Sequence, residues 1–305
     1  MKKHLSLLLL LAAMSGCLPT GSGRHIVETT PAYLDRVTPP YVAREVGNKF
    51  LPIEGQPGEL IWITGVSTEC INKQGETMPD QHLGYSTLDF HYPEWHNQKL
   101  DTVQASRLFA LGAGSREYTL PPGYGVPLMS NEPLWYTSRV ANPDPYFPAQ
   151  RLSQRLELRY TRRRGLEHPL KSVTVRTLSV VDSGSHLWEV PPGSKTAVTE
   201  VTPLLHLSEK TNLVGAQVVM YRFARRAALV DLTSGEELLV LNATTNQKGE
   251  VQGLESYADP EGIVLDPSHR YAVRAEYENI GEQTVLGAAY WQVYLTDSKF
   301  ELPAR

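Results

Sequence analysis

Short apolar runs rich in valine, isoleucine, leucine, threonine and tyrosine dominate the chain after about residue 45, and turn-forming residues separate them. The i, i+3, i+4, i+7 spacing of an amphipathic helix is hardly sustained beyond two turns anywhere. The clearest runs predict strands over residues 59–66, 84–90, 106–111, 135–140, 155–160, 172–181, 196–201, 216–223, 227–231, 237–242, 271–277 and 284–295. The pattern predicts an all-β protein.

These runs fall into two sets. A polar turn at Asp182-Ser183-Gly184-Ser185 separates the sets, so we place a domain boundary near Ser183. Two tandem antiparallel β-sandwiches of jelly-roll type, over residues 46–182 and 183–305, fit the spacing of strands and turns. Between two later runs, the segment Asp231–Glu236 ends in a glycine suited to positive φ and predicts a hairpin.

The beginning of the chain has the order of a secretion signal. Lys2 and Lys3 precede the apolar run Leu5–Ala13, and small residues then lead to Cys17. Because this run is much shorter than the roughly 18 to 20 residues that cross a bilayer, residues 1–16 are predicted to be a signal peptide. No later run reaches that length, so no transmembrane helix is expected.

Met14-Ser15-Gly16-Cys17 resembles the bacterial lipobox. The resemblance implies that Cys17 receives a diacylglycerol and becomes the mature N-terminus, where several acyl chains would form a stable anchor. The alternative is an ordinary signal peptide with a nearby thiol. Leu18 stands where an Asp retains many lipoproteins in the inner membrane, which favours the outer membrane. We therefore expect a cell-envelope protein whose partner is the membrane, with residues 17–45 as lipidated N-terminus and tether.

Charge and cysteine content narrow the possible partners. A formal net charge of −4 argues against a nucleic-acid partner. With Cys17 lipidated, Cys70 is the one remaining thiol of a chain with 2 cysteines, so no internal disulfide is expected. A lone cysteine at a strand end is expected to be half-buried and inert, and the alternative is a ligating or oxidised thiol.

Familiar catalytic signatures are absent from the sequence. It contains no G-x-S-x-G, no H-E-x-x-H, no P-loop and no C-x-x-C, so hydrolase, zincin and nucleotide-binding classes lose most of their support. Four single histidines lie beside turn residues and are expected to be structural: His168, His186, His206 and His269.

Two surface features each leave two interpretations open. A basic stretch could dock anionic lipid, lipopolysaccharide or an acidic partner, or its charges could point outward from an edge strand and block aggregation. A set of aromatic residues could form a binding face or fill a core. The basic stretch comprises Arg155, Arg159, Arg162, Arg163 and Arg164. The aromatic set comprises Trp95, Trp135, Tyr136, Tyr146 and Phe147.

A succession of turn and strand-end motifs carries one family resemblance. The motifs are Trp188–Gly193, Arg225–Glu236, Tyr257–Gly262, His269–Tyr271 and Glu276–Asn279. In this order they resemble the second half of the copper type II, ascorbate-dependent monooxygenases, the peptidylglycine α-hydroxylating monooxygenase superfamily, in its bacterial branch. Residues 60–140 resemble the first half more loosely. The resemblance implies a fold of two β-sandwiches.

The chain differs from this family at the positions of the copper ligands. In its second domain a His-x-His pair and a late methionine hold copper, and the resemblance places Val219, Tyr221 and Ala288 at these positions. Valine and alanine have no donor atom, and a neutral phenol is a poor copper ligand. In the first domain a family histidine falls at Gly84-Tyr85. Three other histidines nearby could hold a metal, although we favour solvent-exposed or hydrogen-bonded histidines: His82, His91 and His96.

Three hypotheses follow. The favoured one is a non-catalytic, membrane-anchored envelope lipoprotein that keeps the monooxygenase-like double sandwich as a binding or scaffold module. No cofactor is then expected, and the partner beyond the membrane is an envelope protein or a small ligand. The alternative is a copper-dependent monooxygenase or electron-transfer protein with a rearranged site. The third is a polysaccharide- or peptide-binding lipoprotein of unrelated ancestry.

Overall fold

The computed structural model describes residues 21–34, 52–53, 58–91, 107–142, 146, 148–164 and 166–297, and the backbone of residues 44–50. In this part nearly every regular element is a strand, and the helical elements are the short α1 (Thr202–Leu205) and a 3₁₀ turn, η2 (Asp80–His82). The prediction of an all-β fold is confirmed. Among the described residues, no helix is both long and apolar enough to cross a membrane.

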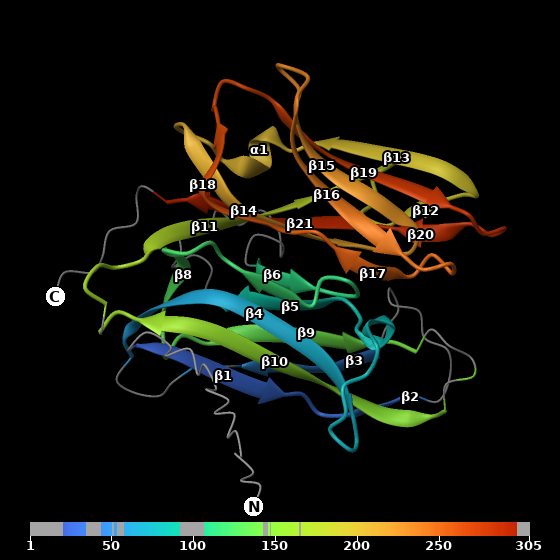
Figure 1. Ribbon diagram of the computed structural model, residues 1–305, viewed down its shortest axis with the longest axis horizontal. Coiled ribbons are helices and arrows are strands. Elements are labelled where there is room, and N and C mark those ends of the chain that lie inside the picture. Colours follow the sequence, from blue (N-terminus) through green and yellow to red (C-terminus); the bar gives the residue numbers. More distant parts are fainter. Residues whose placement is uncertain are drawn as a thin grey trace, which may run out of the picture.

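The first lobe consists of two sheets that enclose one core (Figure 1). One sheet has the order β1-β10-β4-β8, with β2 paired to β10 and β7 to β4. Its strands are β1 (Ser22–Glu28), β2 (Ala32–Leu34), β4 (Leu60–Asn72), β7 (Glu117–Thr119), β8 (Tyr124–Met129) and β10 (Gln150–Arg162). The other has the order β3-β9-β5-β6. Its strands are β3 (Arg44–Phe50), β5 (Ser86–Phe90), β6 (Arg107–Leu111) and β9 (Leu134–Val140).

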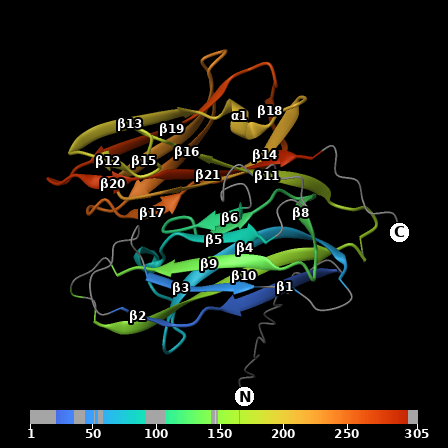
Figure 2. The same ribbon diagram turned by 180° about the vertical axis from the view of Figure 1, so that it is seen from behind.

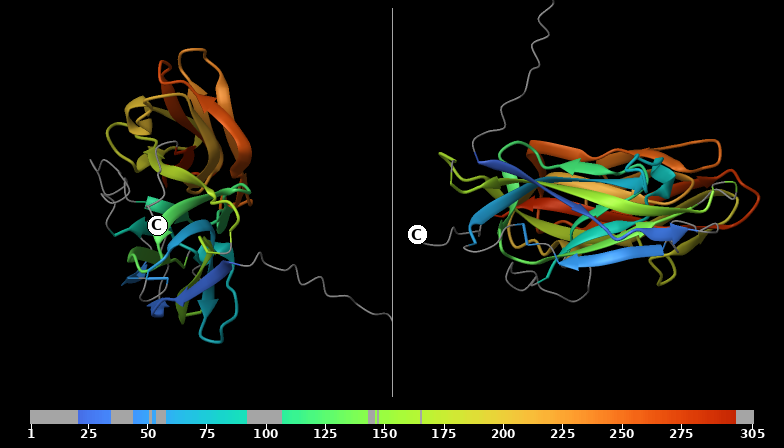
Figure 3. Two further views of the ribbon diagram at one scale, coloured as in Figure 1. Left: turned by 90° about the vertical axis from the view of Figure 1, so that its left-hand side faces the viewer. Right: turned by 90° about the horizontal axis from the view of Figure 1, so that it is seen from below.

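The second lobe lies above the first in Figures 1 and 2, and Figure 3 shows the same stacking end-on. Its inner sheet contains β11 (Lys171–Ser179), β14 (Thr211–Met220), β18 (Tyr257–Leu265) and β21 (Ala289–Thr296). Its outer sheet, in the order β13-β19-β15-β16-β17, contains β13 (Gly193–Glu200), β15 (Ala224–Asp231), β16 (Glu237–Thr245), β17 (Val251–Leu254) and β19 (Tyr271–Asn279). A two-stranded sheet adds β12 (Trp188–Val190) and β20 (Val285–Gly287).

The two lobes share both a sheet and a core. A short parallel pairing of β8 with β11 joins the first-lobe sheet to the order β11-β21-β14-β18. Val173, Val175, Val214 and Tyr294, all from the inner sheet of the second lobe, belong to the first-lobe core. The inner sheet therefore buries both of its faces. Strand β11 precedes the boundary that we placed near Ser183, yet it pairs along its length with β21.

Alternation along β10 explains how a strand with many charges joins a core. Leu152, Leu156 and Leu158 are buried, whereas the intervening arginines and glutamates are more exposed. The buried side chain of Gln154 accepts hydrogen bonds from Ser86 Oγ at 2.8 Å and from Tyr136 Oη at 2.7 Å. These bonds compensate the cost of burying its carbonyl group.

Residues 22–28 and 32–34 differ from the tether predicted for residues 17–45. They form β1 and β2, and β1 pairs with β10 over its whole length. The sequence of β1 does not alternate between apolar and polar residues, because Ile26 is 56% exposed and both faces carry polar residues. Periodicity therefore gave no signal for a strand here. The hairpin predicted at Asp231–Glu236 is confirmed, since β15 and β16 pair across it and Gly235 has φ 79°.

Candidate functional site

An open-sided pocket of about 330 Å³ lies on the face of the β5–β6–β9 sheet that points away from the first-lobe core. Along β9 every second residue is buried, and the residues between them, Trp135, Thr137 and Arg139, are half-buried and line the pocket. The period of two in a strand therefore separates this polar and aromatic lining from the apolar core.

A buried ion pair forms one wall of the pocket. Arg107 Nε lies 3.0 Å from Asp89 Oδ1, and their side chains are only 10% and 11% exposed. Thr87 Oγ1 donates a second hydrogen bond to this carboxylate, at 2.9 Å. Since an unpaired charge would be costly at this depth, each partner fixes the other, and the Arg107 guanidinium is held in one orientation.

Tyr85 connects this ion pair to the rest of the pocket. Arg107 Nη1 donates a hydrogen bond to the Tyr85 hydroxyl. Burial raises the pKa of Tyr85 to about 12, and the Arg107 charge lowers it by less. The phenol is therefore neutral at physiological pH. Because its oxygen accepts from Arg107, its own proton can be donated to a ligand in the pocket.

Arg139 supplies the second positive charge of the pocket. No carboxylate within the described part of the chain forms an ion pair with it. Its charge acts on the neighbouring phenols of Tyr85 and Tyr290 and favours their ionised forms slightly. At the other end of β9's pocket face, the rings of Trp135 and His91 stack, with centroids 6.1 Å apart and planes 9° apart. The lining thus combines a guanidinium with an aromatic stack.

The pocket borders the second lobe. The ring of Tyr85 lies 5.3 Å, between centroids, from that of Tyr290 in β21. Tyr290 is the register partner of Val219 in β14. A Cβ atom added at Gly112, next to β6, would lie only 3.0 Å from Val219 Cγ1, so Val219 faces the first lobe.

The positions that the resemblance assigns to second-domain copper ligands are neighbours in space. Met220 pairs with Ala289, and continuation of this register places Tyr221 opposite Ala288. The hydroxyl of Tyr277 accepts hydrogen bonds from the backbone N–H groups of Tyr221, at 3.3 Å, and of Ala288, at 3.2 Å. Met220 itself points into the second-lobe core, as its place between Val219 and Tyr221 requires.

These residues do not fit a copper ion. The side chains of Val219 and Ala288 contain no donor atom. Burial raises the pKa of Tyr221 well above its ordinary value of 10, with a further increase from the neighbouring tyrosine Tyr290, so its phenol stays protonated. Across the described ranges, no group of three or more histidine, cysteine, aspartate and glutamate side chains is placed to hold a metal.

The structure separates the described histidines of the predicted first-domain metal site. His82 is fully buried in η2, where its Nδ1 lies 2.9 Å from the carbonyl oxygen of Ala141. His91 follows the opposite end of β5, at the pocket. His96 lies outside the described residues, as does Cys17.

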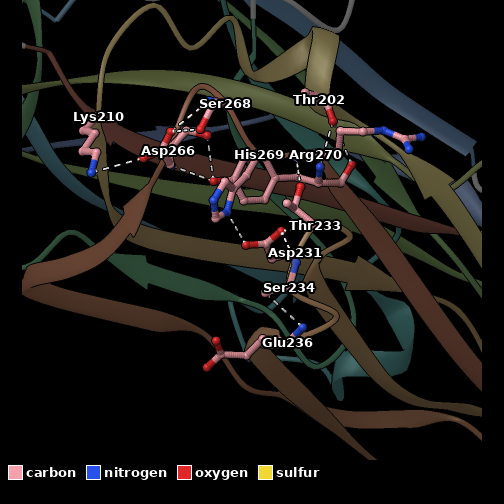
Figure 4. A network of polar contacts seen from close by, with 11 residues as sticks. Thr202, Lys210, Asp231, Thr233, Ser234, Glu236, Asp266, Ser268, His269 and Arg270 are labelled. Atoms are coloured by element: carbon pink, nitrogen blue, oxygen red, sulfur yellow. Dashed lines mark hydrogen bonds and ion pairs between the residues drawn. The ribbon is translucent and has the colours of Figure 1, made fainter.

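Of the four histidines expected to be structural, three take part in local structure and His168 is exposed. His186 Nδ1 lies 2.9 Å from Ser179 Oγ, and His206 ends α1 with φ 51°. His168 lies exposed between β10 and β11. His269 Nδ1 lies 2.6 Å from Oδ2 of Asp231, the residue that begins the hairpin (Figure 4).

Asp231 explains why this histidine contact is structural. Its Oδ1 accepts hydrogen bonds from the backbone N–H groups of Thr233 and Ser234 and thereby stabilises the turn. The contact with His269 links this turn to the loop between β18 and β19. Burial raises the pKa of the Asp231 carboxyl, but the hydrogen bonds from His269, Thr233 and Ser234 outweigh this effect and lower it below 3.8.

Ion pairs neutralise the strand part of the predicted basic stretch. Arg155 bonds Glu28 at 2.7 Å and Glu69 at 2.8 Å, each on a neighbouring strand. Arg159 bonds Glu117 at 2.6 Å. The structural interpretation holds for these two arginines, although β10 lies between β1 and β4 instead of at the edge.

The other predicted residues divide between core and surface. Cys70 is 2% exposed and packs in a small cluster with Leu34 and Leu152, so the thiol is fully buried and the prediction of half-burial is wrong. Tyr136 is buried in the first-lobe core, whereas Tyr146 is 93% exposed. Trp95 and Phe147 lie outside the described residues. Of the three aromatic residues of this set that the structure describes, Trp135 alone lines the pocket.

Sequence reasoning missed most of the pocket. Asp89, Arg107 and Arg139 lie on three strands and form no motif along the chain. One signal was present, because Asp89 stands between Leu88 and Phe90 in a predicted strand, and a charge in a buried strand requires a partner. The identity of that partner, 18 residues later, depends on the pairing of β5 with β6.

Comparison with known proteins adds little to this picture. No family model matches the chain, and no curated protein matches it. Similar solved structures include the STIV MCP (10% identity, TM-score 0.35, covering 89% of this chain and 96% of that one). A peptide-N(4)-(N-acetyl-β-D-glucosaminyl)asparagine amidase has 10% identity, TM-score 0.38 and coverages of 92% and 98%. The cowpea mosaic virus top component has 7% identity, TM-score 0.38 and coverages of 96% and 95%. At these TM-scores the similarity carries no argument about function.

Proposed function

We propose that this protein is a lipid-anchored component of a bacterial cell envelope that binds a small anionic ligand and performs no copper chemistry. The pocket on β5, β6 and β9 would be the binding site. The chain would thus use a double β-sandwich as a binding module, with its lipid on Cys17. The copper alternative finds no donor at Val219 or Ala288 and only a protonated phenol at Tyr221.

The observation that carries this proposal is Arg139, a half-buried arginine without a described ion-pair partner, beside the phenolic donor of Tyr85. A guanidinium presents two parallel N–H groups that match a carboxylate or a phosphate. The Arg107 charge is already matched by Asp89, so the pocket has a net positive charge. Positive charge in a partly enclosed pocket favours an anion.

Pocket size and the aromatic stack restrict the rest of the ligand. A volume of about 330 Å³ is near the lower limit of small-molecule sites, roughly 300 Å³. Trp135 lies four residues from Arg139 on the same strand face, roughly 13 Å away along an extended chain. The ligand class that fits is therefore a single ring, of a sugar or an aromatic compound, bearing one carboxylate or phosphate.

Calorimetric titration of the purified protein tests this class with charged probes and their neutral counterparts. The probes are benzoate against benzamide, and glucuronate against glucose. We expect one charged probe to bind at least about tenfold more tightly than its counterpart, and Arg139→Gln to remove that preference. Arg222→Gln, an exposed arginine of the second lobe, is the matched control. Equal binding of charged and neutral probes, or an unchanged preference in Arg139→Gln, would overturn the proposed site.

Two further measurements test the other parts of the proposal. After loading with Cu(I) and Cu(II) and dialysis, elemental analysis should find much less than one copper per chain; one or two retained ions would overturn the non-copper assignment.

Cys17→Ala should shift the protein from the membrane fraction to the soluble periplasmic fraction. Retention of this variant in the membrane would contradict the lipid anchor.

A further inference from the structure

The described part of the chain begins very close in sequence to the proposed lipid. The carbonyl oxygen of Gly21 accepts a hydrogen bond from the backbone N–H of Arg162, at 2.8 Å, and Ser22 begins the pairing of β1 with β10. Four residue steps separate Cys17 from Gly21. At no more than about 3.6 Å each, these steps span at most roughly 14 Å. An anchor on Cys17 would therefore hold the start of β1 next to the lipid headgroups.

Two exposed arginines and the half-buried Arg163 surround the start of β1. Arg24 is in β1, and its side chain is 57% exposed. Arg163 and Arg164 directly follow β10, whose last residues pair with the first residues of β1. The Arg164 side chain is 76% exposed. We call Arg24, Arg163 and Arg164 the β1-end arginines.

The charges of this surface are only partly neutralised. Arg163 donates a hydrogen bond to the carbonyl oxygen of Leu166 and has no ion pair among the described residues. Arg164 lies 3.4 Å from Glu59, a carboxylate that also pairs with Arg162 at 2.7 Å. Arg24 lies 3.8 Å from Glu157, at the limit of an ion pair. A positive surface thus marks one end of a chain whose formal net charge is −4.

We propose that the β1-end arginines dock on the anionic headgroups of the membrane in which the Cys17 lipid is inserted. This inference rests on the proposed lipid anchor. Charge complementarity and the short connection both select a lipid surface as the partner, because an exposed arginine within a Debye length of anionic lipid is attracted to it. Arg155 and Arg159 do not take part, because carboxylates on β1, β4 and β7 already bind them.

Docking of this end orients the whole molecule. In Figure 1, β10 ends and β1 begins on the left-hand side, whereas β13 begins on the right-hand side. The end of the first lobe at which β1 begins would therefore face the membrane, and the start of β13 would face away from it. A rigid arrangement is expected, since the shared sheet and core connect the lobes.

Fluorescence quenching by nitroxide-labelled lipids tests this orientation on the full lipidated chain. The protein is inserted into vesicles of phosphatidylcholine alone, or of phosphatidylcholine with about 30% phosphatidylglycerol, which gives the vesicles an anionic surface. A fluorophore is attached at His168→Cys, near the β1-end arginines, or at Ser194→Cys, in β13. Buried Cys70 does not compete for the label.

We expect at least about threefold stronger quenching at position 168 than at position 194 in the anionic vesicles. The charge-reversed variant Arg163→Glu/Arg164→Glu should lose this difference. Lys210→Glu/Lys248→Glu, which changes the net charge equally on the second lobe, should keep it. Equal quenching at the two positions, or no effect of reversing Arg163 and Arg164, would overturn the docking inference.

Vesicle flotation separates this inference from the anchor on which it rests. A chain that does not float with the vesicles contradicts lipidation of Cys17. A chain that floats but shows equal quenching at positions 168 and 194 contradicts only the proposed orientation.

Discussion

Replacement of Tyr294 by phenylalanine tests whether the two lobes form one folding unit. Tyr294 belongs to β21 of the second lobe but is fully buried in the first-lobe core. Its ring stacks on Tyr118 of β7, with centroids 4.9 Å apart and planes 10° apart. Its hydroxyl donates to the carbonyl oxygen of Leu108 at 2.9 Å and accepts from Gln217 Nε2 at 3.3 Å. Phenylalanine keeps the ring stacking and removes both hydrogen bonds.

The expected magnitude follows from the groups that lose their partners. The Leu108 carbonyl and the Gln217 amide remain buried, and a buried polar group left without a partner costs about 1–3 kcal/mol. Gln217 can compensate poorly, because its Oε1 already has no hydrogen-bond partner in the described part of the chain. Tyr294→Phe should therefore lower the free energy of unfolding by about 2–6 kcal/mol.

Urea unfolding followed by tryptophan fluorescence and far-UV circular dichroism measures this effect. The shared core predicts one transition with coincident midpoints, shifted to lower urea in the variant. Tyr257→Phe is the matched control. Tyr257 lies near the contact between the lobes and contributes its backbone carbonyl, which accepts a hydrogen bond from Tyr118 and is kept in the variant. A loss below about 1 kcal/mol, or a loss equal to that of the control, would refute the reasoning. Two well-separated transitions in the wild type would refute the shared core.

Two further predictions concern single ionisable groups. Burial raises the pKa of Cys70 to about 12. The native protein should therefore react with a maleimide at pH 7.5 at least about 100-fold more slowly than the urea-unfolded chain. Rapid stoichiometric labelling of the native protein would contradict this burial. The pKa of Asp231 is lower in the folded chain than its ordinary 3.8, so its contribution to stability is present above about pH 4 and is lost as the pH falls through the folded value. The melting temperature should accordingly fall less between pH 6 and pH 3 in Asp231→Asn than in the wild type, and an identical fall in both proteins would be inconsistent with this role.

The sequence predicted the strands best where one face is buried and the other is not. The β9 and β10 runs alternate clearly, and the structure contains strands at each predicted run. Strand β8, with five buried residues in succession and a proline, lacks this alternation and was not predicted. Strand β1 was interpreted as tether, because pairing with β10 satisfies its backbone without an apolar pattern of its own.

The candidate pocket could be predicted only in fragments. Trp135 and His91 were recognised as residues of interest, but not that their rings stack. Arg107 and Arg139 were not recognised. Their roles differ because Arg107 forms an ion pair with Asp89, and that pairing depends on which strands lie side by side. The basic stretch around β10 was recognised as a unit, and cross-strand glutamates then divided it into a neutralised part and an exposed end.

By itself the sequence determined the all-β fold and the hairpin at Asp231–Glu236, since each depends on neighbours along the chain. Tertiary structure decided the rest: the sheet that crosses both lobes, the pocket beside Tyr85, and which arginines keep a charge without a partner. The physical reason is that strand pairing joins residues far apart in sequence, and one strand's pattern of polar and apolar residues does not specify the strand beside it.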